Sequence, residues 1–349
     1  MHGGDIYRNQ VHMDFSVNLN PLGTPDEVMR AVCDALPGAH VYPDPEQAAL
    51  RQVIAEAIGC RADAVVAGNG VSELLMVAVR AEHPKQAVVF APAFSGYAYA
   101  LEALGCRIHS IVADEKTGLC FMGRDLDAIP ADTDMIFVCD PANPTGQALS
   151  EEALTALLHK TAGKGITVCL DESFRLLSDQ WAEALSEKRL SLLETYDHLL
   201  FLRSFTKVLA MPGIRAGYAV SSPERIQRIR RQLPEWNLSV CSEAMIRSGI
   251  HLLYETGFAE ESVKEIQKER DFLSKGLKEA ALPVCESSAP FLLFRGPVQL
   301  QKKLLLKGIL IRDCSDFAGL SEGTYRIAVK SRKDNQTLLA ALKEVLHEL

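Results

Sequence analysis

Short apolar runs alternate with longer amphipathic stretches between about residue 45 and residue 220, and this alternation constrains the fold more than any other feature of the sequence. The runs are rich in Val, Ile, Leu and Phe, which is typical of strands that are buried on both faces. Helix-length stretches separate most of them, and this spacing favours parallel strands under helices on each side. We therefore expect an α/β fold, with a large domain built on a mostly parallel seven-stranded sheet covered by helices.

The seven expected strands are 64–67, 87–91, 106–112, 135–139, 166–170, 198–202 and 216–220. The helices between them are expected at 45–58, 71–82, 96–104, 150–162 and 183–195. After residue 222 the pattern changes to helices at 223–232, 240–282 and 334–348 and strands at 290–294, 309–312 and 324–329. We expect the large domain to span 40–222, and we expect 1–39 and 223–349 to form a smaller α+β domain.

Composition and charge exclude several classes of protein. The net charge is −8 and no long Lys/Arg run occurs, so we expect no nucleic-acid partner. No apolar run approaches the roughly 18 residues that span a membrane, and the N-terminus is too polar for a signal peptide. The nine histidines form no H-E-x-x-H pattern, so we expect no metal site. The nine cysteines contain no C-x-x-C pair and indicate reduced thiols in the cytoplasm.

The loops that follow the strands are the places to look for a site, because ligands bind at the carboxyl ends of strands in such a sheet. After 64–67, Gly70 permits a tight turn and Ser72 stands where a helix begins. The free N–H groups of that helix start, from Val71 onward, could cradle a phosphate, although a plain glycine turn is the alternative. After 87–91, Phe94 could lie on a flat ring or could pack into the core.

Two further loops carry polar side chains. Asn143 follows 135–139 and precedes a proline, which favours an extended backbone from which its amide can reach a ligand oxygen. Asp171 follows 166–170, where a carboxylate can cap a helix or hold a proton on a ring nitrogen.

The stretch RSFTKVLAMPGIRAGY at 203–218 indicates that these loops bind one common ligand. We expect Lys207 to form a Schiff base with a carbonyl cofactor, and Ser204 and Arg215 to bind the phosphate of that cofactor. Asp171 would keep a pyridine nitrogen protonated, so that the ring can accept electrons from the substrate's α carbon. Lys207 alone would be an ordinary surface lysine, but in combination these side chains, each placed after a strand, indicate a pyridoxal-phosphate site.

The motifs resemble those of the fold-type-I pyridoxal-phosphate enzymes, the aspartate-aminotransferase superfamily, from end to end of the chain. Within this group the chain is most similar to the histidinol-phosphate aminotransferase branch. HGG at 2–4, DFSVNLNPLG at 14–23, YPDP at 42–45 and ILIRDC at 309–314 resemble the decarboxylase of that branch that acts on threonine phosphate in cobalamin synthesis. The motifs shared with the whole superfamily are GNG at 68–70, PAF at 92–94, NPTG at 143–146, DES at 171–173, SFTK at 204–207 and PGIRAGY at 212–218.

The resemblance implies a role for each matching position. Lys207 and Asp171 are the expected catalytic residues, with Asn143 on the ring hydroxyl and Phe94 on the ring face. The cofactor phosphate is expected to contact Gly70, Val71, Ser72, Ser204 and Arg215, and Tyr42 from a second subunit. This last contact implies a homodimer with composite active sites. The substrate's anionic groups are expected to meet His2, Asn18, Arg312 and Arg326, with the division between the two arginines left open.

The implied reaction is decarboxylation of threonine phosphate to (R)-1-aminopropan-2-yl phosphate, or of serine phosphate. The aminotransferases usually have tyrosine where this chain has Phe174, which favours decarboxylation. The alternatives are transamination of histidinol phosphate and a non-catalytic cofactor-binding domain, although the intact Lys207 argues against the latter. A nucleotide-binding domain would need G-x-x-x-x-G-K-[ST] or G-x-G-x-x-G, and neither pattern occurs.

Overall fold

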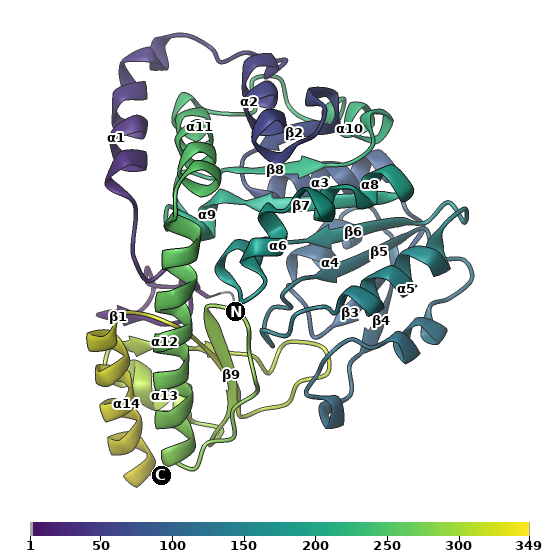
Figure 1. Ribbon diagram of the computed structural model, residues 1–349. Helices are drawn as coiled ribbons and strands as arrows, with labels where there is room; N and C mark the ends of the chain where they lie inside the picture. The colour runs from purple at the N-terminus through teal and green to yellow at the C-terminus, as the bar shows by residue number, and fades with distance from the viewer. Residues whose placement is uncertain (1–2, 349) are drawn as a thin grey trace.

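The computed structural model describes residues 3–348, except for the side chains of residues 116, 187 and 188. The chain forms a large lobe around a seven-stranded sheet and a small lobe that contains the C-terminus (Figure 1). The large sheet has the strand order β2-β8-β7-β6-β5-β3-β4. Its strands are β2 (Val65–Gly68), β3 (Gln86–Ala91), β4 (Arg107–Val112), β5 (Met135–Cys139), β6 (Thr167–Asp171), β7 (Leu199–Ser204) and β8 (Gly217–Val220). The expected α/β fold and all seven expected strands are confirmed.

The direction of β8 determines which residues meet at the edge of this sheet. The strands β4, β3, β5, β6 and β7 pair in parallel, whereas β8 is antiparallel to both β7 and β2. In this register Gly217 lies opposite Ser204 on one side and Gly68 on the other. The start of β8 therefore lies beside the ends of β2 and β7, and Arg215, just before β8, is brought to the edge that carries the carboxyl ends of the strands.

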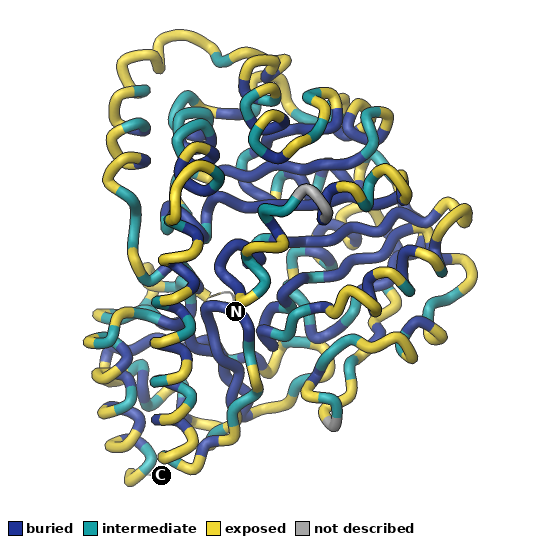
Figure 2. The backbone as a smooth tube through the Cα atoms, in the orientation of Figure 1, coloured by how far each residue is buried: buried dark blue, intermediate teal, exposed yellow. Residues whose placement is uncertain are grey.

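Helices cover both faces of the sheet because alternate residues of each strand face opposite sides. Val65 and Ala67 of β2 belong to one hydrophobic core, while Val66 between them belongs to the core on the other face. Figure 2 shows the sheet as a buried layer between helices whose outer sides are exposed. The first face is covered by α2 (Ala48–Ile58), α5 (Glu151–Thr161) and α11 (Val240–Glu255), and the second by α3 (Val71–Glu82), α4 (Gly96–Glu102) and α10 (Pro223–Arg230).

The small lobe has its own sheet and core. Its three-stranded antiparallel sheet has the order β11-β12-β9, and a parallel pair joins β1 of the N-terminal segment to β10. The strands are β1 (Met13–Asp14), β9 (Phe291–Arg295), β10 (Ile309–Leu310), β11 (Arg312–Asp313) and β12 (Thr324–Ala328). The helices are α12 (Phe258–Glu279), α13 (Leu300–Leu306) and α14 (Arg332–His347).

Other short elements connect the two lobes or cap the sheet. The helix α1 (Asp26–Ala35) packs on α11, away from β1, and forms the outer arm of the molecule (Figure 1). The remaining helices are α6 (Trp181–Leu185), α7 (Glu187–Leu190), α8 (Leu192–Thr195) and α9 (Phe205–Val208), with 3-10 turns at η1 (Leu36–His40), η2 (Ala62–Ala64), η3 (Glu115–Thr117), η4 (Gly123–Ala128) and η5 (Arg175–Leu177).

Three expected elements are broken in the structure. The stretch 183–195 forms parts of three short helices, separated at Ser186 and Ser191, because serine competes for backbone hydrogen bonds and favours helix ends. The stretch 240–282 is two helices, because Thr256 is extended and its hydroxyl accepts the N–H of Phe258 at the start of α12. The expected strand 309–312 is divided between β10 and β11, which pair with different strands.

The expected domain boundary at residue 222 stays a prediction. The helix α10 contacts α3 and β2, and α11 contacts α1 and α2, so both pack with elements of the large sheet. The long helix α12 then runs into the small lobe (Figure 1).

A buried network of charges fixes the ends of β5, β6 and β7. Glu172, next to Asp171, accepts 2.8 Å hydrogen bonds from Nε of Arg189 and from Nε of Arg203. Arg189 also donates to Asp140, which directly follows β5, at 2.8 Å. Burial opposes ionisation of Glu172, which is 3% exposed, but the charges of the neighbouring arginines outweigh it and lower its pKa to about 2. The network therefore stabilises the ionised carboxylate inside the sheet edge.

Replacing Glu172 with Gln would leave two buried guanidinium groups without this counter-charge. We expect the free energy of unfolding, measured by urea denaturation, to fall by about 3–5 kcal/mol. Glu243→Gln is the matched control, because Glu243 pairs with Arg247 on the surface of α11 at 2.7 Å. That partly exposed pair should contribute about 1 kcal/mol or less.

The same substitution should change the response to acid. The pKa of Glu172 lies below its ordinary value of 4.5, so its stabilisation is fully present above that value and is lost as the pH falls toward about 2. Between about pH 5 and pH 3 the stability of the wild type should therefore fall more steeply than that of Glu172→Gln. Equal slopes for the two proteins would contradict the assignment.

Candidate active site

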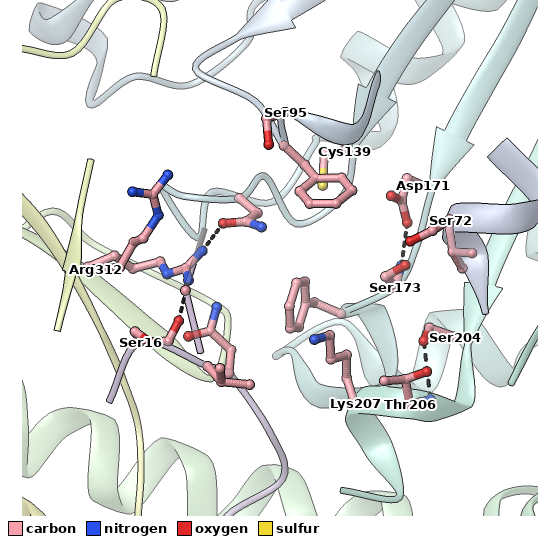
Figure 3. Close-up of a pocket in the computed structure, with 18 of the residues that line it drawn as sticks. Ser16, Ser72, Ser95, Cys139, Asp171, Ser173, Ser204, Thr206, Lys207 and Arg312 are labelled. Atoms are coloured by element: carbon pink, nitrogen blue, oxygen red, sulfur yellow. Dashed lines mark hydrogen bonds between the residues drawn. The ribbon is translucent and has the colours of Figure 1, made fainter. Parts of the chain in front are cut away.

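A cavity of about 230 Å³ lies between the carboxyl edge of the large sheet and the small lobe. In Figure 3, Lys207, Asp171, Ser72 and Ser204 stand on one side of this opening and Arg312 stands on the other. Eleven of the residues expected at the site line the cavity: Asn18, Val71, Ser72, Phe94, Asn143, Asp171, Ser204, Lys207, Arg215, Arg312 and Arg326. The edge of the sheet thus brings together the side chains that follow separate strands.

Lys207 lies on α9, the single helical turn that follows β7. Removal from water lowers the pKa of its amine to about 8, and the positive charges of Arg326 and Arg215 act in the same direction, while Asp171 opposes them. A larger share of this amine is consequently neutral near pH 7 than for a surface lysine. Because the neutral amine is the form that attacks a carbonyl, the cavity activates Lys207 as a nucleophile.

Asp171 ends β6 and is 4% exposed. Its Oδ1 accepts the backbone N–H of Ser173 at 2.9 Å, and its Oδ2 accepts the hydroxyl of Tyr97 at 2.7 Å. Burial raises the pKa of Asp171 above its ordinary value, and these two hydrogen bonds limit that rise. The carboxylate is held in a fixed orientation, with a raised affinity for a proton or a protonated ring nitrogen.

An anion cradle forms where α3 begins. Gly70 precedes α3 with a φ of +76°, and a Cβ there would lie 2.9 Å from Nη2 of Arg215. A Cβ at Gly217 would lie 2.9 Å from the carbonyl oxygen of Arg203 and 3.2 Å from the backbone nitrogen of Val71. The two glycines therefore let the guanidinium and the N–H groups of the helix start converge, as a bound phosphate requires. Gly70 itself backs this cradle and is not among the residues that line the cavity.

Phe94 and Asn143 also line the cavity. Gly96 makes room for the ring of Phe94, because a Cβ at Gly96 would overlap it. Asn143 accepts a hydrogen bond through Oδ1 from Nη1 of Arg326, and Nη2 of Arg326 donates to the carbonyl of Ser16 at 2.7 Å. One guanidinium from β12 thus joins the small lobe to the N-terminal segment and to the loop after β5.

Two buried polar atoms on this side have no protein partner among the residues that the structure describes, namely Nε of Arg326 and Oδ1 of Asn18. Burial lowers the pKa of Arg326 to about 10, so the group remains positively charged at neutral pH. A cationic donor and an amide acceptor without partners are suited to a polar ligand.

Besides Gly70, one described residue that was expected at the site does not line the cavity. Tyr42 is 77% exposed, does not line the cavity, and packs against Trp236 with ring centroids 4.9 Å apart. His2 lies outside the described residues. Within its own chain Tyr42 does not reach the cavity, so its contact with the cofactor stays a prediction.

The structure also places residues at the site that sequence reasoning missed. Thr206 and Ser173 lie inside the SFTK and DES motifs, so their positions could have been read from the strand ends. Phe317 lines the cavity five residues after Arg312, outside any recognised motif. Tyr97 lies behind the cavity wall, and its contact with Asp171 joins residues 74 positions apart, so no local pattern predicts it. The other lining residues in this group are Gly3, Ser16, Val17, Ser95 and Cys139.

The residues present fit pyridoxal phosphate. Lys207 offers a neutral amine for the aldehyde, Asp171 a buried carboxylate for the ring nitrogen, and the turn at Gly70 with Arg215 a cradle for the phosphate. Across residues 3–348 no cluster of three or more His, Cys, Asp or Glu side chains could hold a metal ion, apart from the side chain of residue 187, which is not described. In the same part of the chain, no helix combines the length and apolar character needed to cross a membrane.

The pKa of Lys207 gives a direct test in the enzyme freed of cofactor. Limiting acetic anhydride should label Lys207 with a midpoint near pH 8, as quantified by peptide mass spectrometry across a pH series. Lys307 serves as the control, because its hydrogen bond to Glu344 raises the pKa of that amine above 10.5. A common midpoint for the two lysines would show that the cavity does not perturb Lys207.

Comparison with known proteins agrees with this geometry. The chain is 32% identical to the threonine-phosphate decarboxylase of Salmonella typhimurium, over 96% of this chain and 91% of that protein. It is 27% identical to the adenosylcobalamin biosynthesis bifunctional protein of Leptospira interrogans, over 96% of this chain and 39% of that protein. The crystal structure of histidinol-phosphate aminotransferase from Clostridium acetobutylicum matches with a TM-score of 0.87 and 28% identity, over 97% of this chain and all of that one.

The family model that describes aminotransferases of class I and II matches residues 10–342, which include every residue of the cavity except Gly3. With a lysine, an aspartate and an anion cradle in the arrangement described above, the chain belongs to the aminotransferase class I and II family.

Proposed function

We propose that this protein is a pyridoxal-phosphate enzyme that decarboxylates L-threonine O-3-phosphate to (R)-1-aminopropan-2-yl phosphate, a step of cobalamin biosynthesis. The observation that carries the proposal is the pair of arginines on the small-lobe side of the cavity, Arg326 and Arg312. A substrate with an anionic group at each end can engage both arginines, whereas an amino acid with an uncharged side chain has only one such group to offer. The relative from Salmonella supports this substrate, and the relative from Leptospira supports this pathway.

The structure supports a division of labour between the two arginines. Arg326 bonds to Asn143, and its charge lowers the pKa of Lys207, so it lies at the reacting end of the cavity. Arg312 sits farther from the reacting lysine, against the ring of Phe317 at 5.0 Å. We assign the substrate carboxylate to Arg326 and the phosphate to Arg312, with Asn18 as a further polar contact.

These residues would select the bond that breaks. Pyridoxal phosphate, when bound, supplies an electron sink for the electron pair left on the substrate's α carbon. Arg326, held by Asn143 and Ser16, would orient the carboxylate so that the bond between it and the α carbon is the one aligned for cleavage. Carbon dioxide leaves, and one proton takes its place on the α carbon. The Nζ of Lys207 is our candidate for the donor of that proton.

Phe174 favours decarboxylation over the aminotransferase alternative. Its ring packs against Phe291 with centroids 5.1 Å apart and lies 5.9 Å from Nζ of Lys207. Phenylalanine offers no hydroxyl to the ring oxygen of the cofactor, where the aminotransferases of this branch usually have tyrosine. The wall beside Lys207 is therefore apolar and helps to keep water from the α carbon.

The substrate assignment is tested by product analysis. With threonine phosphate alone, the enzyme should release carbon dioxide and form aminopropanyl phosphate without any keto acid. Serine phosphate lacks one methyl group, a difference of about 1–3 kcal/mol, so it should react about 10- to 200-fold less efficiently. Formation of glutamate from histidinol phosphate with 2-oxoglutarate as the amino acceptor, in the absence of decarboxylation, would favour the aminotransferase instead.

The two arginines give matched variants for the same assay. Arg326→Gln and Arg312→Gln should each lower kcat/KM by about 100-fold, because each loses a hydrogen-bonded charge pair with the substrate. Only Arg326→Gln should also raise the pKa of Lys207, since it removes a positive charge that acts on that amine.

We also propose a homodimer with composite active sites. Apolar side chains are exposed along the N-terminal arm and beside it, which favours a partner surface there. This set comprises Leu22, Met29, Leu36, Val41, Tyr42 and Trp236. Tyr42 extends from this region without reaching its own cavity, so a second subunit would receive it.

Subunit mixing tests the composite site. Lys207→Ala should be inactive and Tyr42→Ala strongly impaired, whereas an equal mixture of the two should regain activity. If subunits exchange at random, half of the dimers are mixed and each has one intact site, giving about a quarter of wild-type activity. Tyr99→Ala, at a tyrosine that is 71% exposed, is the control for loss of a surface ring. No recovery in the mixture would argue that each subunit completes its own site.

A further inference from the structure

Arg312 is engaged by a carboxylate of its own loop. Its Nη2 donates to Oδ1 and Oδ2 of Asp316 at 2.8 and 2.9 Å, and its Nη1 donates to the backbone carbonyl of Asp313. The guanidinium also stacks over the ring of Phe317. These contacts hold the arginine that our proposed function assigns to the substrate phosphate.

The occupied nitrogen is the one that phosphate recognition needs. A guanidinium can bind an anion with two parallel hydrogen bonds either through Nε with Nη2 or through Nη1 with Nη2. Both arrangements use Nη2, where both oxygens of Asp316 are bound. A phosphate that takes a two-bond position on Arg312 therefore competes with Asp316 for Nη2.

The position of Asp316 is suited to such an exchange. The side chain of Arg312 is 9% exposed, whereas that of Asp316 is 46% exposed, so water can solvate the carboxylate after it leaves. Arg312 borders the active-site cavity and two adjoining cavities, and Asp316 borders only the adjoining two. The carboxylate can withdraw on that outer side while the guanidinium turns to the ligand.

We propose that Asp316 is an intramolecular competitor of the substrate phosphate for the bidentate edges of Arg312. In the free enzyme Asp316 is the counter-ion of Arg312, and the substrate phosphate displaces it when the substrate binds. Before the ligand binds, only a fraction of the molecules has Arg312 released from Asp316. The apparent affinity for the phosphate is the intrinsic affinity multiplied by that fraction. Asp316 thus limits occupation of the site by weak anions, and this inference rests on the proposed assignment of Arg312 to the phosphate.

Binding of isopropyl phosphate to the enzyme loaded with pyridoxal phosphate tests the inference. This probe carries the branched carbon, ester oxygen and phosphate of threonine phosphate but no amine, so it binds without reaction. Isothermal titration calorimetry should show that Asp316→Asn binds the probe about three- to tenfold more tightly than the wild type. Asp316→Ser should show the same gain, which separates loss of charge from any effect of the Asn side chain.

Two further variants complete the design. Asp313→Asn removes the same charge from the same loop, but its Oδ1 accepts the N–H of Ser315 at 2.9 Å and does not contact the guanidinium of Arg312. It should change the affinity by less than about twofold, the range expected for a surface substitution. In an Arg312→Gln background, which binds the probe weakly, Asp316→Asn should have no further effect.

The opposite results would overturn the inference. Weaker binding by Asp316→Asn would mean that the carboxylate orients Arg312 for the ligand, and unchanged binding would mean that the contact is not exchanged. The readout is separate from the reaction: if threonine phosphate is not decarboxylated but the probe binds as expected, the proposed function fails while the competition stands.

Discussion

The ion pairs of Glu172 hold together the strand ends on which the site is built. Asp171 and Glu172 are consecutive, so the extended backbone directs one carboxylate to the cavity and the other into the interior. Glu172 accepts hydrogen bonds from Arg203 of β7 and from Arg189. Arg189 also donates to Asp140, the residue that directly follows β5. The position of Asp171 relative to Lys207, one strand away, is therefore fixed by buried charges that never touch a ligand.

The cavity contains an excess of positive charge, and this excess serves two purposes. Lys207, Arg215, Arg312 and Arg326 line it, against the single carboxylate of Asp171 among its lining residues in the part of the chain that is described. Such a field attracts an anionic cofactor and a substrate with two anionic groups. Removal from water lowers the pKa of Lys207 to about 8, and two of these charges, those of Arg326 and Arg215, contribute to the lowering. Arg326 and Arg215 therefore contribute both to the binding of anions and to the activation of the amine.

Residues could be predicted from the sequence where a strand end determined their place. Lys207, Asp171 and Asn143 follow strands whose apolar runs are unambiguous, and parallel pairing brings such ends to one edge. The hydroxyl of Tyr97 on Asp171 joins residues 74 positions apart, and the contact of Arg326 with Ser16 joins residues 310 apart. No local pattern encodes such pairings. The break within 240–282 could not be predicted for a different reason. The apolar periodicity of α11 resumes in α12, directly after the short interruption at Thr256, so the pattern resembles one long helix.

The two ends of the proposed substrate meet arginines that are held in different ways. Arg326 is buried and donates hydrogen bonds to Asn143 and to the backbone carbonyl of Ser16, so it joins three segments of the chain. A rotation of its guanidinium would break these hydrogen bonds. Arg312 is held by a half-exposed carboxylate on its own loop, a partner that water can replace. Choice of the bond to be broken requires a fixed direction at the α carbon, whereas entry and release require an exchangeable contact at the phosphate. A rigid arginine beside Lys207 and an exchangeable one farther out meet both requirements within a single cavity.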